Sequence, residues 1–235
     1  TFDSGIKAVI NTDDCLNCGL CVDYCRFDAI HPNASGNLEV NHFQCEGCRL
    51  CERVCPSEAI SIVHNENNSW YVSNTRFGKL VHARMGPGEE NSGKLVTEVR
   101  RKAKEIAVES KADFIINDGP PGIGCSAIAS VTGTNLVLLV IEPTLSGLHD
   151  AARLAELAES FKVPVQAVIN KYDINFELSR KVENYLSEKK IPLAGRLAFE
   201  PKMVESMVAE KTIVEFDPAA EISREFYSIW NRIRL

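Results

Sequence analysis

The sequence predicts an α/β protein in which a parallel sheet carries helices on both faces, together with a small cysteine-rich α+β domain at its start. Two observations support this prediction. In the second half of the chain, short apolar runs alternate with longer amphipathic stretches, a pattern typical of strands joined by helical crossovers. Eight of the nine cysteines lie in two runs of equal spacing. A chain of 235 residues can hold one large domain or two smaller ones.

Each cysteine run has the spacing C-x2-C-x2-C-x3-C, over residues 15–25 and again over residues 45–55. Eight thiolates at this spacing suit two four-iron clusters, and the fourth cysteine of each run then reaches the other cluster. Zinc is the alternative for any one C-x2-C pair, but a four-ligand ion does not explain a third cysteine at the same step, twice. We therefore expect two [4Fe-4S] clusters. Crossed ligation assigns Cys15, Cys18, Cys21 and Cys55 to one cluster, and Cys45, Cys48, Cys51 and Cys25 to the other.

The two runs also form an internal repeat, in which residues 14–30 match residues 44–60. This stretch resembles the bacterial two-cluster ferredoxins, which implies a ferredoxin domain over residues 6–65. Short strands are predicted at residues 6–12, 37–41 and 59–64, and the polar residues 65–68 end the domain. Arg26 stands where such ferredoxins usually have a proline, whereas Pro56 keeps it in the second run; this difference concerns a turn and not ligation.

The charge of the chain is unevenly distributed. Residues 1–65 contain nine Asp or Glu and four Lys or Arg, a net charge of −5, whereas the whole chain carries −6. An acidic domain does not suit nucleic acid, whose binding needs a basic face. It suits a basic redox partner, and a solvated acidic surface with no partner is the alternative.

Several features bear on location. Clusters need reduced thiolates, which indicates a cytoplasmic protein. No apolar run of about 18 residues predicts a membrane span, and no signal peptide is recognisable. The first residue is Thr1 and not Met, so the natural protein can begin earlier.

Residues 66–235 are expected to form the α/β domain. Residues 70–75 and 79–85 predict a hairpin, and residues 95–109 predict a helix. Strands are then expected at 113–117, 136–141, 165–169 and 192–197. Helices are expected at 148–161, 176–189 and 222–233. The continuous apolar character of 136–141 and 165–169 is typical of parallel strands buried on both faces.

Candidate nucleotide-binding residues follow two of these strands. The motif Asp118-Gly-Pro-Pro-Gly122 comes directly after the apolar run 114–116. An aspartate at this edge of a sheet can hold Mg²⁺ in phosphoryl-transfer sites, so Asp118 is the candidate catalytic residue. Gly119 and Gly122 would let the backbone approach a phosphate, although an ordinary strand-to-helix turn would also explain them.

A second group, Asn170-Lys-Tyr-Asp173, follows the strand predicted at 165–169. With the motif at Asp118 and the segment 142–150, it resembles the MinD/ParA class of P-loop ATPases, and in particular members with an inserted ferredoxin domain. That resemblance covers nearly the whole chain. It implies a P-loop NTPase fold, a homodimer, and binding of ATP and Mg²⁺ coupled to the clusters. Asn170 would then contact adenine. The same residues also fit the N-K-x-D motif of GTPases, in which Asp173 would select guanine.

The chain departs from this class at the phosphate loop. The class has a G-K-G-G-x-G-K-T loop before the ferredoxin insert, and roughly 30 residues of a βαβ unit would have to precede Thr1 to supply one. Gly88–Leu95 has the G-x4-G-K spacing, but Leu95 replaces the Ser or Thr that would bind magnesium. We interpret it as a different loop, with Asn91 or Lys94 at a dimer face or simply at the start of a helix. Cys125 is expected to be a free thiol.

Three functions are consistent with these residues. The first is electron transfer through two [4Fe-4S] clusters coupled to an ATP-binding domain, with a separate redox protein as partner. The second is an iron–sulfur cluster carrier or assembly scaffold with ATPase activity. The third is a ferredoxin on a nucleotide-binding support that has lost its activity. ATP hydrolysis is expected for complete members of the class and doubtful for this chain, and neither nucleic acid nor membrane is an expected partner.

Overall fold

The computed structural model describes residues 5–64, 68–86 and 93–234. The chain divides into two compact units, Thr1–Asn117 and Asp118–Leu235. The first unit is longer than the ferredoxin domain expected at residues 6–65, because it also contains the hairpin and the helix that follow. The domain boundaries at residues 65 and 66 therefore stay a prediction based on sequence.

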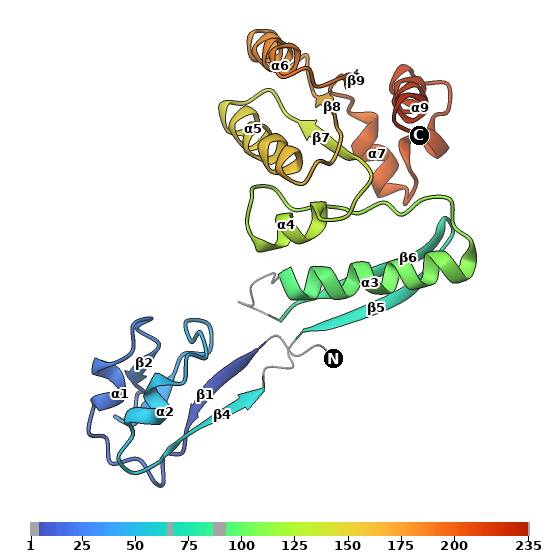
Figure 1. Ribbon diagram of the computed structural model, residues 1–235. Helices are drawn as coiled ribbons and strands as arrows, with labels where there is room; N and C mark the ends of the chain where they lie inside the picture. Colours follow the sequence, from blue (N-terminus) through green and yellow to red (C-terminus); the bar gives the residue numbers. More distant parts are fainter. Residues whose placement is uncertain (1–4, 65–67, 87–92, 235) are drawn as a thin grey trace. The chain divides into compact units, whose positions relative to one another are not determined.

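The cysteine-rich part of the first unit is built from two small antiparallel ladders and two short helices (Figure 1). One ladder pairs β1 (Ile6–Ile10) with β4 (Ile60–His64), and the other pairs β2 (Ile30–Pro32) with β3 (Leu38–Val40). The helices α1 (Leu20–Asp23) and α2 (Leu50–Val54) each begin directly before the third cysteine of a run. The core between them is small and includes cysteine side chains, among them Cys21 and Cys45. The predicted strands at 6–12, 37–41 and 59–64 are confirmed, and β2 was not predicted.

The sequence repeat is also a repeat of backbone conformation. The left-handed residues Asn17, Gly19 and Asp28, with φ of 50°, 79° and 47°, recur as Gly47, Arg49 and Glu58, with φ of 63°, 62° and 54°. Backbone hydrogen bonds repeat as well, since Asn11 N donates to Ala59 O at 2.8 Å and Asn41 N donates to Ala29 O at 2.7 Å. Both halves therefore fold the chain around their cysteines in the same way.

The rest of the first unit is a hairpin and a helix. The strands β5 (Ser69–Thr75) and β6 (Gly78–Arg84) pair antiparallel across a tight turn, with Thr75 opposite Gly78. Thr75 closes this turn by donating its hydroxyl to Gly78 O at 2.8 Å. Helix α3 (Gly93–Ser110) packs against β6 and buries Leu95. The hairpin and the helix predicted at 95–109 are confirmed.

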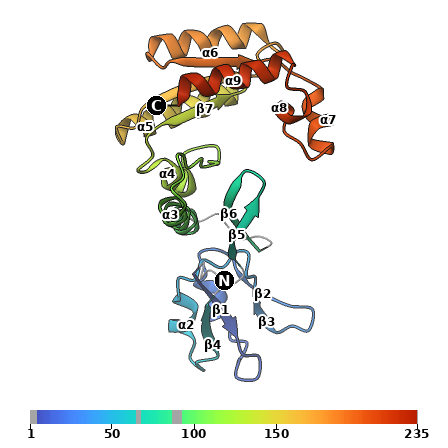
Figure 2. The ribbon, with the colours of Figure 1, turned by 90° about the vertical axis from the view of Figure 1, so that its right-hand side faces the viewer.

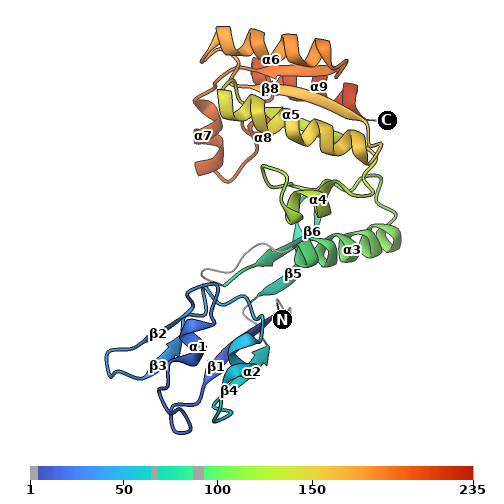
Figure 3. The ribbon, with the colours of Figure 1, turned by 60° about the vertical axis from the view of Figure 1, so that its left-hand side comes forward.

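The second unit contains a parallel sheet whose described strands lie in the order β7-β8-β9. These are β7 (Val137–Ile141), β8 (Val165–Asn170) and β9 (Leu193–Leu197), linked by α5 (Leu145–Ser160) and α6 (Phe176–Glu188). Alanines of α5 and apolar side chains of α6 pack on one face, while α9 (Glu221–Ile233) covers the other. Figure 3 shows α5 in front of β8 and α9 behind it. The predicted α/β class, with helices on both faces of a parallel sheet, is confirmed.

Three shorter helices of this unit were not predicted. They are α4 (Cys125–Val131), α7 (Lys202–Val208) and α8 (Ile213–Phe216). Thr212 begins α8 with a capping box, in which its side chain accepts from Glu215 N while Glu215 accepts from Thr212 N. Figure 2 shows α7 and α8 side by side. Helices this short give little periodic signal in the sequence.

The strand predicted at residues 113–117 is wrong. The structure has no strand there, and Phe114, Ile115 and Ile116 are 52%, 46% and 81% exposed. A strand requires a neighbour to complete its hydrogen bonds, and no strand in the described part of the chain pairs with this segment.

Within the described residues, no helix is long and apolar enough to cross a membrane.

Candidate iron–sulfur and nucleotide sites

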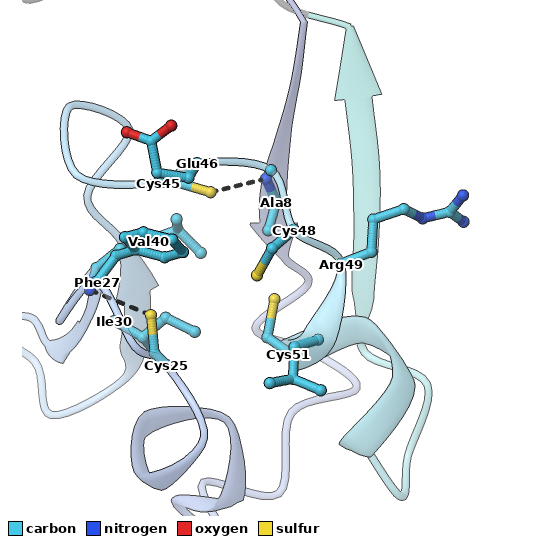
Figure 4. Close-up of a pocket in the computed structure, with 13 residues that line it drawn as sticks. Ala8, Cys25, Phe27, Ile30, Val40, Cys45, Glu46, Cys48, Arg49 and Cys51 are labelled. Carbon is cyan, nitrogen blue, oxygen red and sulfur yellow. Dashed lines mark hydrogen bonds between the residues drawn. The ribbon is translucent and has the colours of Figure 1, made fainter.

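The second cysteine loop and the end of the first run line one pocket. Cys25 shares this pocket with Cys45, Cys48 and Cys51, although it lies twenty residues before the nearest of them. In Figure 4 the sulfurs of Cys25, Cys48 and Cys51 point toward the same space, whereas Arg49 points away from it. Apolar groups such as Phe27, Ile30 and Val40 form the rest of the wall. This is the grouping that crossed ligation predicts.

Backbone amides hold the sulfurs of this pocket in place. Ala29 N donates to Cys25 Sγ at 3.3 Å, and Ala8 N donates to Cys45 Sγ at 3.5 Å. Lys7 Nζ donates to Cys45 O at 2.7 Å. Strand β1 and the chain after α1 therefore fix two cysteines that are far apart in the sequence.

The other four cysteines also come together. Burial raises the pKa of the Cys21 thiol, and nearby Cys15, Cys18 and Cys55 raise it further. Cys55 lies 3.7 Å from Ser57 Oγ. Burial acts to raise the pKa of the Cys55 thiol, but hydrogen bonds from Ser57, Ala59 and Ile60 outweigh it, so its pKa is lowered. Cys55, from the second run, thus shares its surroundings with the first three cysteines of the chain.

The eight cysteines of the two runs could bind either single zinc ions or iron–sulfur clusters. All nine cysteines are free thiols. Within the described residues, no three His, Cys, Asp or Glu side chains are arranged to hold a single metal ion. A tetrahedral zinc site would bring four ligands within about 2.3 Å of one ion, whereas a cubane of iron and sulfide separates its four thiolates more widely. The two runs of four cysteines each, and not the absence of a single-ion site, are what favour clusters over zinc. Burial raises the pKa of the Cys51 thiol to about 11, so binding has to displace its proton.

Two of the predicted nucleotide residues lie at the carboxyl ends of the parallel strands. Asn170 is the last residue of β8, and Asp173 Oδ1 accepts a hydrogen bond from Phe199 N at 2.7 Å, beyond β9. Lys171 pairs with Glu142, which follows β7, at 2.5 Å. Lys171 and Asp173 therefore both have local partners, and neither needs a nucleotide to explain it. The base contacts expected of Asn170 and Asp173 therefore both stay predictions.

The residues predicted to face the phosphates or magnesium are exposed or half-buried where the structure describes them. Asp118 and Gly119 are exposed, and Gly122 adopts a left-handed conformation with φ of 80°. No hydrogen bond or ion pair in the described part of the structure joins Asp118 to Asn170. Most of the Gly88–Leu95 segment, including Asn91, lies outside the described residues, while Lys94 is exposed in the first turn of α3. Cys125 is exposed at the start of α4.

Sequence reasoning missed two residues that shape the cysteine loops. Lys7 contacts Cys45 from β1, and the side chain of Asn17 accepts from Leu38 N at 3.2 Å. The repeat itself holds the signal, because aligning its halves sets Lys7 against Asn37 and Asn17 against Gly47. Such unmatched positions within a repeat mark where the halves differ in chemistry.

Comparison with known proteins agrees with the two-part organisation. Residues 8–62 match the family described as a 4Fe-4S dicluster domain. The chain is 38% identical over 163 residues to the uncharacterized protein MJ0578 of Methanocaldococcus jannaschii, covering 69% of this chain and 55% of that one. Over 60 residues it is 30% identical to the pyruvate synthase subunit PorD of the same organism, covering 26% of this chain and 70% of the subunit. The chain thus spans about half the length of MJ0578.

Solved structures with a similar fold include the cell division protein MinD of Aquifex aeolicus. That match has 22% sequence identity and a TM-score of 0.53, and covers 69% of this chain and 67% of MinD. A MinC:MinD complex from the same organism matches with a TM-score of 0.52 and 22% identity, covering 69% of this chain and 66% of that one. At this identity the match establishes the fold. The chain therefore carries, at residues 8–62, a member of the 4Fe-4S dicluster domain family, joined to a MinD-like α/β fold.

Proposed function

We propose that this protein transfers electrons through two [4Fe-4S] clusters and that its MinD-like fold binds ATP. The observation that carries the proposal is the pocket in which Cys25 meets Cys45, Cys48 and Cys51. Each cluster, when bound, supplies a one-electron redox centre. The protein contributes thiolate ligands, backbone donors to the sulfurs and apolar walls that limit access of water.

Burial of the ligand cysteines favours electron transfer over a carrier or scaffold function. Cys21 and Cys45 are only 7% and 8% exposed, and both belong to the small core of the domain. Release of a cluster would therefore expose that core. The exposed acidic residues of the domain, such as Asp13, Asp14 and Glu58, suit a redox partner with a basic face.

The cluster content tests the first part of the proposal. Anaerobically purified protein should contain about eight irons and eight sulfides per chain, and reduced samples should show the electron paramagnetic resonance (EPR) signal of interacting four-iron clusters. Stoichiometric zinc without acid-labile sulfide would overturn the proposal. Transfer of clusters to an apo-acceptor within minutes would favour the carrier function instead.

The ATP proposal rests on the MinD-like fold and on Asn170 at the carboxyl end of β8. The described residues include no glycine loop with a following Lys and Ser or Thr, which phosphoryl transfer needs for positioning and charge neutralisation. We therefore expect this chain to bind ATP weakly and to hydrolyse it negligibly, with Asp118→Asn removing any magnesium dependence. Calorimetry and phosphate release measure both quantities. Full turnover by this chain would show that Gly88–Lys94 serves as a phosphate loop.

The expected homodimer also remains a proposal. MinD-like ATPases pair around nucleotide in the class that the sequence resembles, so ATP with Mg²⁺, at concentrations high enough to saturate the weak site, should increase the mass measured by light scattering. A mass that is the same with and without nucleotide would contradict this coupling.

A further inference from the structure

Three consecutive residues of β1 contact the second cysteine loop. A Cβ added to Gly47 would lie 2.1 Å from Ile6 O, so the loop backbone lies directly against the strand. Lys7 Nζ donates to Cys45 O at 2.7 Å, and Ala8 N donates to Cys45 Sγ at 3.5 Å. The strand thus fixes the Cys45 backbone, its sulfur and a partly buried ammonium group in one place.

The first cysteine loop has a different arrangement at the matching positions. Leu38, which corresponds to Ala8, donates its N–H to Asn17 Oδ1 at 3.2 Å and not to a cysteine sulfur. Asn37, which is neutral, stands at the position of Lys7. Cys15 Sγ instead accepts from the nearby Asn17 N at 3.4 Å. The repeat therefore places a cation at the second loop and a neutral amide at the first.

We propose that Lys7 is a positioning residue that raises the reduction potential of the Cys25, Cys45, Cys48 and Cys51 cluster relative to that of the other cluster. This inference rests on the proposed function. One-electron reduction adds a negative charge to a cluster, and an ammonium group nearby stabilises that charge more than the oxidised state. The amide of Ala8 acts in the same direction, because hydrogen bonds to the sulfurs are among the determinants of cluster potential.

Other charged groups near this loop do not duplicate Lys7. Arg49 follows Cys48, but its side chain points away from the pocket and pairs with Glu52 at 2.8 Å (Figure 4). Glu46 is exposed and also points away from the pocket. Among residues 5–64, Lys7 is a cation that donates a hydrogen bond directly to a ligand residue, through the carbonyl of Cys45.

The test is a redox titration followed by EPR, with dithionite as the one-electron donor. Lys7→Met removes the charge and the hydrogen bond, Lys7→Gln keeps a donor without the charge, and Lys7→Arg keeps both. Lys104→Met, at an exposed position of α3 outside residues 8–62, removes a lysine from the same unit as the matched control. Cys18→Ser and Cys48→Ser, each combined with the Lys7 variants, identify which signal belongs to which cluster.

We expect Lys7→Met and Lys7→Gln to lower the potential of the second-loop cluster and to leave the first-loop cluster unchanged. Lys7→Arg and Lys104→Met should titrate like the wild type. Equal shifts of both clusters, or no shift in either neutral variant, would overturn the inference. A shift in Lys7→Met without one in Lys7→Gln would assign the effect to the hydrogen bond and contradict the role of the charge. Absence of acid-labile sulfide in the wild type would instead defeat the proposed function itself.

Discussion

The two cysteine loops have the same spacing and the same backbone conformation, but they are held by different means. The second loop is held from a distance, since β1 contacts Gly47 and Cys45 through both backbone and side chain. The first loop is held mainly by its own Asn17. The backbone N–H of Asn17 donates to Cys15 Sγ, and its side-chain Oδ1 accepts from Leu38 N. Equal ligand spacing therefore does not imply equal cluster environments.

The difference is visible in burial as well. Cys45 is 8% exposed and belongs to the core, whereas the matching Cys15 is only half-buried. Leu16, beside Cys15, is 69% exposed, and its counterpart is the charged Glu46. Since hydrogen bonds, net charge and solvent exposure set cluster potentials, the two clusters should differ in stability and in potential. The following substitutions probe that difference, beginning with the one of largest effect.

Replacing Cys25 with Ser should destroy the cluster of the second loop and spare the cluster of its own run. The reason is the shared pocket of Cys25, Cys45, Cys48 and Cys51. We expect the loss of about four of the eight irons, with a spectrum that matches Cys45→Ser. Cys125→Ser, which changes a cysteine outside both runs, should keep the full iron content. A Cys25→Ser protein that resembled Cys15→Ser would show that ligation is not crossed.

Replacing Gly47 with Ala should weaken the second loop strongly. The residue has φ of 63°, and the new Cβ would lie 2.1 Å from Ile6 O and 2.9 Å from Ile6 Cγ1. The left-handed conformation and the forced movement of β1 together should cost roughly 3 kcal/mol. The measurement is the rate of cluster loss in the presence of an iron chelator, followed by visible absorbance. Unchanged kinetics would mean that β1 does not restrain this loop.

The outcome of sequence-based prediction differed between the two parts of the molecule. Local cysteine spacing was enough to assign Cys25 and Cys55 to clusters without knowledge of any contact. The shared pocket of Cys25, Cys45, Cys48 and Cys51 agrees with that assignment, while the ligand sets themselves stay a prediction. The roles of Lys7 and Asn17 could not, because each depends on a strand that meets a loop about twenty or more residues away. The site residues of the MinD-like half, Asp118 and Asn170, remain predictions.

Errors in the fold have a similar origin. The strands β7, β8 and β9 were predicted from their apolar runs. These predictions are confirmed because each run pairs with a neighbouring strand in the described chain. The run Phe114–Ile116 looks the same in sequence but has no partner strand among the described residues, and it forms no strand. Apolar composition predicts where a strand can form, and pairing determines whether it does.

Replacing Asn17 with Gly should have a moderate effect confined to the first loop. Glycine suits the left-handed backbone of this position and is what the second loop has at Gly47, so the change mainly removes the acceptor for Leu38 N. Loss of one such hydrogen bond should cost about 1 kcal/mol. The expected result is several-fold faster loss of the first-loop cluster under the same chelator assay, with the second-loop cluster unaffected. Faster loss of both clusters would show that the ladders couple the two loops.

Replacing Gly19 with Ala should have an effect no larger than that of Asn17→Gly and well below that of Gly47→Ala. Gly19 has φ of 79°, but a Cβ added there meets no atom within 4 Å, in contrast to Gly47. The matching position holds Arg49 with φ of 62°, so the fold already accepts a side chain at this point of the repeat. Only the conformational cost of a left-handed alanine remains, about 1 kcal/mol. In the chelator assay Gly19→Ala should therefore lose its first-loop cluster more slowly than Gly47→Ala loses the second. Equal rates would mean that both glycines are required for backbone conformation alone, and that the contact between β1 and Gly47 does not distinguish the two loops.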